Sequence, residues 1–414
     1  MISRIYYTDP YCRRFDATVR TAFVHDGRPA VLLDRTAFYP TSGGQPFDTG
    51  HLYAGSTAAD DPRTQSTDVV ETIEVNDDVV HLLSSPLSTG MAVQGEIDWT
   101  RRFDHMQQHT GQHVLSAAFD RLFSNRTTSF HMGPDAATID LARELSWEEI
   151  ERAEDEANRI IWEDRGVSIR FVSPDMVKAG AAIVLRKESS REGVLRLIDV
   201  TDFDVSACGG THVSRTGAIG VVVVSAAEKF RGGTRLTFAC GNRALRTFRG
   251  LRAAVSGSVR VLSVLPEELP AAINRLQGES KELRRSIRKF QEALAEHEAE
   301  RLAASGALMA SHGGSVIVEV LDEWDSNGLK AIALAVTART RAAVALFSAS
   351  QPHAVVIARS PGIPVDAHAV LRALIERFGG RGGGKPDLAQ GGGLSGDLAD
   401  LHASARHLLI ADPS

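Results

Sequence analysis

The spacing of apolar residues changes several times along the chain, and each change predicts a different kind of structure. Up to about residue 95, short apolar runs such as residues 30–33 and 79–83 are separated by clusters of Gly, Pro, Asp and Ser. Runs of this length between turn-forming residues are typical of strands. The pattern predicts a small all-β domain over residues 1–95, with residues 56–67 as an exposed excursion.

A helical period begins at Asp98, which is a suitable N-cap. The apolar stripe expected to be buried comprises Phe103, Met106, Val114, Ala117 and Ala118. A second helix is predicted from about Ser146 to Trp162, because acidic residues occupy its first turn. Strand-like segments follow at residues 168–172, 194–200, 220–225 and 234–240. We therefore expect residues 96–250 to form an α+β domain.

From Leu269 to Arg301 the apolar period becomes seven. The resulting seam comprises Leu269, Ile273, Leu276, Leu283, Ile287, Phe290 and Leu294. A seam held over more than three heptads predicts a coiled coil within a helical segment of residues 251–303. The opposite flank is basic and includes Arg284 and Arg288. Such a flank is either a solvated face or a contact for an RNA backbone.

The last block, residues 304–414, alternates predicted strands with predicted helices. The strands are expected at residues 315–320, 342–347 and 354–358, and the helices at residues 328–341 and 366–378. This alternation predicts a small α/β domain. Near its end, residues 379–393 are so rich in glycine that we expect a flexible loop.

Composition narrows the class of protein. A hydrophobic share of 43% and a charged share of 24% are ordinary for a soluble globular protein. Three cysteines are too few and too odd in number for a disulfide framework, so we expect a reducing compartment. Neither a signal peptide nor a membrane-spanning segment is apparent, so the expected location is the cytoplasm. The net charge of −6 gives no general argument for nucleic acid.

Two pairs of metal-ligand residues carry the most specific chemical signal. His109-Thr-Gly-Gln-His113 and Cys208-Gly-Gly-Thr-His212 each hold two donors four positions apart. On a helix that spacing puts both side chains on one face. Three imidazoles and one thiol form a set that a tetrahedral Zn²⁺ accepts readily, and the double glycine lets the backbone turn close to an ion. The sequence predicts one shared zinc site; the alternative is a buried thiol beside hydrogen-bonded histidines.

The glycine-rich segment near the C-terminus matches the spacing of a nucleotide-binding P-loop only in part. Residues 379–385 supply two glycines and Lys385, but Pro386 stands where the motif needs Ser or Thr. The hydroxyl that would bind Mg²⁺ is therefore absent, and proline has no N–H to offer a phosphate. We reject a P-loop. Arg381 and Lys385, among many backbone amides, remain candidates to hold an RNA phosphate.

The order of these motifs resembles alanyl-tRNA synthetase from its editing half onward. The resemblance rests on Gly43-Gly-Gln45, the two ligand pairs, the continuation of the second pair to Gly217, and the terminal Gly-Gly-Arg-Gly-Gly-Gly-Lys-Pro-Asp. An aminoacylation domain does not precede these motifs, which makes the chain similar to the long form of the free-standing AlaX editing proteins. The resemblance covers nearly the whole chain.

The resemblance implies a fold, a cofactor and an activity. The fold would be a translation-factor-like β-barrel (1–95), a zinc-containing α+β editing domain (96–250), a coiled-coil linker (251–303) and a DHH-associated α/β domain (304–414). That last domain would bind tRNA and, with the coiled coil, form a homodimer. The activity would be hydrolysis of tRNA(Ala) mischarged with Ser or Gly, with Zn²⁺ held by His109, His113, Cys208 and His212.

The resemblance assigns the substrate-contacting residues less directly than the zinc ligands. Residues 127–133 look like the AlaX version rather than that of the synthetase, and Gln112 stands where the synthetase commonly has Thr. The candidates are Gln45, Gln112, Thr128, Ser129, His131, Gly209, Gly210 and Thr211, with Thr127 in the same group. A site that hydrogen-bonds a serine hydroxyl would spare a correctly charged alanine, and we expect Thr128 or Ser129, with Gln112 nearby, to supply that hydrogen bond. No motif identifies a general base, and Glu228 and Asp204 stay open candidates. The alternative function is a zinc-stabilised tRNA-binding module without hydrolytic activity.

Overall fold

The computed structural model describes residues 2–54, 65–173, 186, 194–305 and 313–411. The chain forms two compact units, residues 1–257 and 258–414. The predicted division into four segments is finer than these two units and stays a prediction. No helix among the described residues combines the length and the apolar character needed to cross a membrane.

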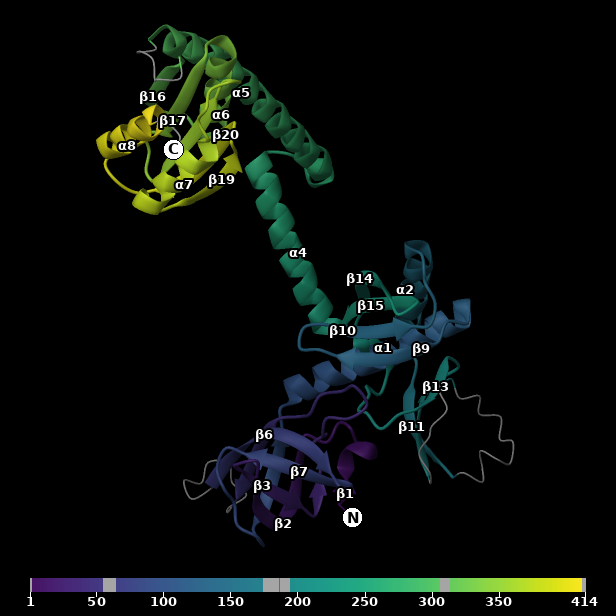
Figure 1. The fold of residues 1–414 in the computed structure, drawn as a ribbon. Coiled ribbons are helices and arrows are strands. Elements are labelled where there is room, and N and C mark those ends of the chain that lie inside the picture. The colour runs from purple at the N-terminus through teal and green to yellow at the C-terminus, as the bar shows by residue number, and fades with distance from the viewer. Residues whose placement is uncertain (1, 55–64, 174–185, 187–193, 306–312, 412–414) are drawn as a thin grey trace. The chain divides into compact units, whose positions relative to one another are not determined.

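The N-terminal part of the first unit is a closed six-stranded barrel, which confirms the predicted β domain (Figure 1). In barrel order the strands are β2 (Arg14–His25), β3 (Arg28–Leu33), β7 (Asp78–Leu83), β6 (Gln65–Val75), β5 (Gly50–Ala54) and β8 (Ala92–Ile97). Alternate residues of β2 are buried, as expected for a strand with one face on a core. Ahead of the barrel, β1 (Ser3–Arg4) pairs with β4 (Arg35–Thr36) and leads into the 3-10 turn η1 (Ile5–Tyr7). Most of the predicted excursion at residues 56–67 lies outside the described residues.

The rest of the first unit is the predicted α+β domain. One sheet has the order β14 (Val222–Phe230), β15 (Gly233–Cys240), β10 (Ala137–Leu141) and β9 (Thr127–Met132). A second has the order β11 (Val167–Val172), β12 (Leu195–Val200) and β13 (Asp204–Ala207). The helices are α1 (Trp99–Phe123) and α2 (Trp147–Trp162), with the 3-10 turn η2 (Thr216–Ile219). Strands β9, β10 and β13 were not predicted, because their apolar residues are few and their lengths short.

Both helices begin where the sequence predicts. The Asp98 side chain accepts a hydrogen bond from the backbone N–H of Arg101 at the start of α1. Ser146 and Glu149 form a reciprocal capping box at the start of α2. Most of α1 is buried, including its polar residues from Gln107 to Gln112. A helix that carries polar side chains into the centre of a domain must give them partners there, and these partners define the candidate site.

The second unit contains a five-stranded sheet covered by helices. Its order is β16 (Ser315–Leu321), β17 (Ala342–Ser348), β18 (His353–Arg359), β20 (Leu388–Leu394) and β19 (Arg381–Lys385), in which only β16 and β17 are parallel. Its helices are α6 (Ser326–Arg339), α7 (Ala367–Phe378) and α8 (Leu398–Ile410). The structure confirms the predicted α/β class and contains one helix, α8, that the sequence analysis did not predict.

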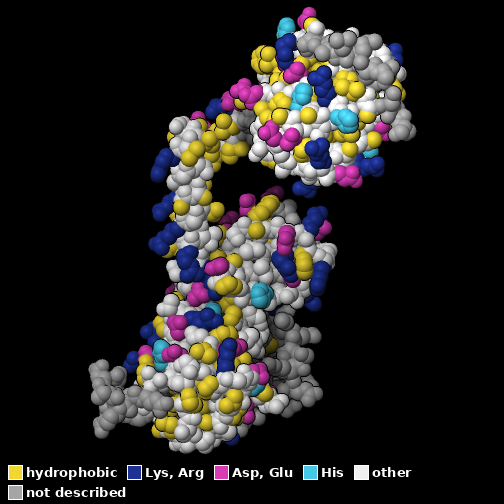
Figure 2. Space-filling view, turned by 60° about the vertical axis from the view of Figure 1, so that its left-hand side comes forward, with side chains coloured by type: hydrophobic (Ala, Val, Ile, Leu, Met, Phe, Trp, Pro, Cys, Tyr) yellow, Lys and Arg dark blue, Asp and Glu magenta, His cyan; other side chains and the backbone are white. Residues whose placement is uncertain are grey.

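The predicted long helix is present as α5 (Leu269–Ser305), which follows α4 (Gly241–Leu262) and the short η3 (Pro266–Glu268). The C-terminal part of α5 packs on α6 through Ala295, Ala299 and Leu302. The heptad seam is uncovered, since Leu283 is 63% and Phe290 69% exposed. Figure 2 shows hydrophobic side chains, in yellow, at the surface of the helical segment beside Lys and Arg side chains, in dark blue. Pairing of this seam with a second chain stays a prediction.

The glycine-rich segment differs from the expected flexible loop. Residues 381–385 and 388–394 form the antiparallel strands β19 and β20, with Gly382 opposite Gly391. A Cβ added at Gly382 would lie 2.5 Å from the carbonyl oxygen of Gln390, and one at Gly384 would lie 2.4 Å from the Cα of Ala389. Glycine is therefore required here by the close approach of two backbones. Periodicity could not predict these strands, because glycine has no side chain to alternate.

Candidate metal centre and the adjoining cavity

Four donor side chains from two distant segments meet inside the first unit. His109 and His113 lie one turn apart on α1, and Cys208 and His212 lie on the loop that follows β13. Their ligand atoms all lie within 4.8 Å of one another. The Cys208 Sγ is 3.4 Å from the Nε2 atoms of both His109 and His212. A tetrahedral zinc with Zn–S of about 2.3 Å and Zn–N of about 2.0 Å needs such donors roughly 3.5 Å apart, so the cluster fits that ion.

The second ring nitrogen of each histidine faces a polar partner. The Nδ1 of His109 is 2.7 Å from the Oε1 of Gln45, and the Nδ1 of His212 is 3.2 Å from the Oγ1 of Thr110. The Nδ1 of His113 is 3.4 Å from the Oδ2 of Asp204, within ion-pair distance but without a hydrogen bond. Partners at Nδ1 fix the tautomer and leave Nε2 free to bind a metal. This arrangement is typical of metal-ligating histidines and is stronger evidence than the ligand set alone.

Electrostatics favour an ionised thiol at the centre of the cluster. Burial disfavours the thiolate of Cys208, but His109 and the hydrogen bonds from neighbouring histidines outweigh burial and hold the pKa of Cys208 well below its usual range. Burial lowers the pKa of His212 to about 3, so its ring is neutral. A thiolate beside neutral imidazole is the protonation state that zinc binding requires.

Gln45, from the barrel, ties the two ligand segments together. Its Oε1 faces His109 and also accepts a hydrogen bond of 3.1 Å from the backbone N–H of Thr211. Its Nε2 donates to the Oγ1 of Thr211 at 2.8 Å. A Cβ added at Gly210 would lie 2.1 Å from the Cε1 of His109, so the loop can pass the histidine only with glycine there. Gln45, Gly210 and Thr211 therefore support the ligands.

The glycine pair before Gln45 joins the barrel to the α+β domain. The backbone N–H of Met132 donates to the carbonyl oxygen of Gly44 at 3.0 Å. Gly44 has φ of +84°, and a Cβ added there would lie 2.6 Å from the carbonyl oxygen of Phe130. Both observations require glycine at this position. The contact holds the Gln45 loop against the strand β9.

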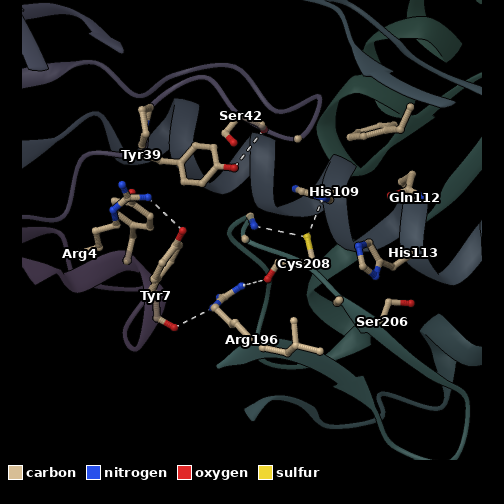
Figure 3. Close-up of a pocket in the computed structure, with 18 of the residues that line it drawn as sticks. Arg4, Tyr7, Tyr39, Ser42, His109, Gln112, His113, Arg196, Ser206 and Cys208 are labelled. Atoms are coloured by element: carbon tan, nitrogen blue, oxygen red, sulfur yellow. Dashed lines mark hydrogen bonds between the residues drawn. The ribbon is translucent and has the colours of Figure 1, made fainter. Parts of the chain in front are cut away.

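A cavity of about 630 Å³ opens beside the four donors. Figure 3 shows that side chains from three regions of the first unit surround it. The barrel side contributes Arg4, Tyr7, Tyr39 and Ser42, helix α1 contributes Gln112, and the second sheet contributes Arg196 and Ser206. The cavity is large enough for a small ligand, and three of the four donor residues, His109, His113 and Cys208, line it.

The predicted substrate residues fall into three groups. Gln112, Thr128, Ser129, Gly209 and Gly210 line the cavity. Gln45 and Thr211 are buried behind the donors rather than in the cavity wall. His131 is exposed and does not line the cavity. The structure thus brings most of the candidates together and places His131 apart.

A β-bulge changes which hydroxyl faces the helix. Strand β9 shifts register at β10, so that Leu141 is opposite Thr127 while Asp140 is opposite Ser129. Thr127 consequently donates from Oγ1 to the Oγ of Ser116 on α1 at 2.7 Å. The Nε2 of Gln112 donates to the same oxygen at 2.8 Å. Thr128 instead donates to the carbonyl oxygen of Asp140 at 3.1 Å, within its own sheet.

The two residues considered as general bases are differently placed. Asp204 is buried and pairs with Arg186 at 2.7 Å, besides facing His113. Its contacts with His113 and Arg186 outweigh burial and hold the pKa of Asp204 far below its usual range. It is therefore a permanent carboxylate that orients a histidine. Glu228 lies on β14 and does not line the cavity.

Sequence reasoning did not identify Arg4, Tyr7, Tyr39 or Arg196. They lie far from the ligand motifs in sequence and reach the cavity only through tertiary structure. The candidate RNA contacts lie in the second unit. Arg381 and Lys385 are exposed on β19, and Arg284 and Arg288 line a shallow groove beside Ile273 and Leu276. Contact of these four residues with RNA stays a prediction.

Comparisons with known proteins agree with this architecture. Three family models match: tRNA synthetases class II (A) at residues 14–101, the threonyl and alanyl tRNA synthetase second additional domain at residues 195–236, and the DHHA1 domain at residues 313–410. The alanyl-tRNA editing protein AlaX-L of Pyrococcus horikoshii is 32% identical over 400 residues, which covers 94% of each chain.

Longer relatives match over part of their length. Alanine–tRNA ligase of Pyrococcus abyssi is 31% identical over 94% of this chain, which spans 41% of the ligase. A solved structure, the C-Ala domain of Aquifex aeolicus alanyl-tRNA synthetase, is 26% identical and covers 26% of this chain and 98% of that domain, with a TM-score of 0.24. A TM-score this low supports no conclusion about the fold.

Proposed function

The chain belongs to the family of alanyl-tRNA editing proteins that includes AlaX-L, and we propose that it is a hydrolase that removes a wrongly attached amino acid from tRNA(Ala). The proposed substrates are Ser-tRNA(Ala) and Gly-tRNA(Ala). The observation that carries the proposal is the buried cluster of three histidines and one cysteine, with every Nδ1 facing a polar partner, at the wall of a ligand-sized cavity.

His109, His113, Cys208 and His212 would hold the zinc ion. A bound zinc would supply Lewis-acid stabilisation for the negative charge that develops on the ester carbonyl oxygen. The chain's own residues do the rest. Gln45 and Thr110 keep the imidazoles of His109 and His212 in the required tautomers, the Asp204 carboxylate lies beside His113, and the cavity walls position the ester.

Selectivity for serine needs a polar group in the cavity that alanine would leave without a partner. A pocket built for alanine excludes a smaller residue by only ~1–3 kcal/mol per methylene and rejects an added hydroxyl poorly, which is why a second site is useful. Gln112, Ser116 and Thr127 form a hydrogen-bonded group next to His113. We propose that Gln112 and Thr127 recognise the serine hydroxyl, in place of the Thr128 or Ser129 favoured by sequence alone.

The proposal is tested by measuring deacylation of Ser-, Gly- and Ala-charged tRNA(Ala) by the wild-type protein and by Cys208→Ala. Rapid loss of Ser or Gly with Ala spared, and abolished in Cys208→Ala, is expected. Cys12→Ala is the matched control, because this half-buried thiol lies in the barrel outside the cluster. Equal loss of all three amino acids, or full activity of Cys208→Ala, would contradict the proposal.

A second candidate is a zinc-stabilised tRNA-binding module without hydrolytic activity. It is favoured by the number of protein donors, since four side chains fill a tetrahedral shell as in structural zinc sites. This alternative predicts that the three charged tRNAs bind equally and are not turned over. The deacylation experiment therefore decides between the two functions.

A further inference from the structure

Arg196 lies at the meeting point of the barrel and the metal-ligand loop. It projects from β12 and donates from Nη1 to the carbonyl oxygen of Cys208 at 2.6 Å. Its Nε donates to the carbonyl oxygen of Tyr7 at 2.9 Å. Figure 3 shows the guanidinium between these two residues, on the wall of the cavity. One cation therefore touches both a proposed ligand residue and the first turn of the chain.

The guanidinium of Arg196 is buried and leaves one of its nitrogens without a hydrogen-bond partner. The Arg196 residue is 8% exposed, and among the described residues no carboxylate pairs with it. Its Nη2 is buried and has no hydrogen-bond partner within the described part of the chain. A buried guanidinium nitrogen without an acceptor is destabilising unless an anion or another acceptor binds to it.

A second donor on the cavity wall, the hydroxyl of Tyr6, also lacks an acceptor. The Tyr6 hydroxyl lines the same cavity, is buried, and has no partner among the described residues. Arg4 is different, because its Nη2 pairs with Glu74 at 2.6 Å. Arg196 and Tyr6 both line the cavity, and each carries a buried donor atom that has no partner in the described part of the chain. An anion with several acceptor oxygens would satisfy both.

We propose that Arg196 binds the 5′-phosphate of the nucleotide that carries the amino acid. The inference rests on the proposed function and deepens it, because it places the end of the RNA in the cavity. An aminoacyl ester brings an ammonium group but no anion of its own, so the nearest negative charge is the phosphate of the same nucleotide. Arg196 touches Cys208, so it lies one side chain away from the donors, where that phosphate would be.

The test uses two non-hydrolysable ligands, 3′-serylamido-3′-deoxyadenosine with and without a 5′-phosphate. Their dissociation constants are measured by calorimetry on the full chain. The wild-type protein is expected to bind the phosphorylated ligand about tenfold more tightly, as for a hydrogen bond to a charged group. In Arg196→Gln this preference should disappear while binding of the unphosphorylated ligand stays within about twofold. Arg20→Gln is the matched control, because Arg20 is exposed on β2 and does not line the cavity.

Several results would overturn the proposal. A wild-type protein without phosphate preference does so regardless of any variant, and points to an ordered water on Nη2 instead. Equal weakening of both ligands in Arg196→Gln would show that the residue only supports the Cys208 loop. If Arg196→Gln does not fold, Arg196→Lys replaces it and is expected to keep a reduced preference; loss of binding to both ligands would count against the proposal.

Failure of the inference is distinguishable from failure of the proposed function. Deacylation of Ser-tRNA(Ala) with no phosphate preference would remove the role of Arg196 alone. A phosphate preference lost in Arg196→Gln, together with no turnover of Ser-tRNA(Ala), would leave the nucleotide subsite and remove the hydrolase.

Discussion

Arg102 and Asp48 form an ion pair that joins helix α1 to the barrel, with both side chains completely buried. The Nε of Arg102 donates to the Oδ2 of Asp48 at 3.0 Å. Arg102 also donates from Nη1 to the carbonyl oxygen of Pro10 at 2.8 Å, and from Nη2 to that of Ala37. The guanidinium thus fixes the helix that carries His109 and His113 against three separate segments of the barrel side.

Removing this guanidinium should strongly destabilise the first unit. Arg102→Met leaves the Asp48 carboxylate buried without its partner, which typically costs about 3–5 kcal/mol. Urea unfolding measures the loss. Arg14→Met is the control, because Arg14 pairs with Glu96 on the exposed barrel surface, where such pairs contribute at most about 1 kcal/mol. Equal effects of the two substitutions would contradict the assignment, and Arg102→Met with Asp48→Leu should recover part of the loss.

The contact between His113 and Asp204 predicts an effect on metal affinity. Asp204→Asn keeps the size of the side chain but removes the carboxylate 3.4 Å from Nδ1. Loss of such a partner typically weakens binding about 10–100-fold, and competition with a chromophoric chelator measures zinc affinity. Asp199→Asn is the control, since Asp199 pairs with Arg170 on the same sheet outside the cluster. Unchanged zinc affinity in Asp204→Asn would contradict the orienting role.

Local sequence signals predicted much of this fold. The caps at Asp98 and Ser146 predicted where α1 and α2 begin, and the second helix also ends as predicted at Trp162. The four donors could be predicted because the two members of each pair are close in sequence. Only one long-range contact, between the two pairs, had to be inferred. Zinc binding itself stays a prediction.

Features that depend on tertiary structure were not predictable. Tyr7 and Arg196 meet through a side chain-to-backbone bond between residues 189 positions apart, which no spacing reveals. The bulge in β9 reverses the alternation between Thr127 and Thr128, so a period of two assigns the wrong hydroxyl to the inner face. The glycine strands β19 and β20 carry no pattern at all.

The uncovered seam of α5 predicts association of two chains. Leu283, Ile287 and Phe290 are between 48% and 69% exposed, and burying them against a second copy is favourable. Light scattering at micromolar concentration should give the mass of a dimer. Leu283→Glu with Phe290→Glu should give a monomer, whereas Lys289→Glu, on the basic flank, should leave the dimer intact. A wild-type monomer would refute the predicted homodimer.

His81 should make the barrel sensitive to acid. The ring is completely buried, with Nε2 2.8 Å from the Oγ1 of Thr36 and Nδ1 3.3 Å from the carbonyl oxygen of Val31. Burial lowers the pKa of His81 to about 4, whereas an unfolded histidine titrates near ~6.5. Between these values the unfolded chain binds a proton that the folded chain does not. The free energy of unfolding should therefore fall by about 3 kcal/mol as the pH drops from ~6.5 to about 4, and be insensitive to this group above that range.

Comparison with His81→Gln isolates this contribution from other groups that titrate in acid. Glutamine keeps a polar side chain for Thr36 and Val31 but cannot gain a proton, so the variant should lose less stability over the same pH range. Urea unfolding at pH 8, 7, 6, 5 and 4 gives both curves. The difference in stability between the two proteins should be constant at pH 8 and 7 and shrink as the pH falls, because only the wild-type protein is destabilised by proton uptake at residue 81. Parallel curves down to pH 4 would show that His81 is protonated in the folded barrel and that its burial does not shift its titration.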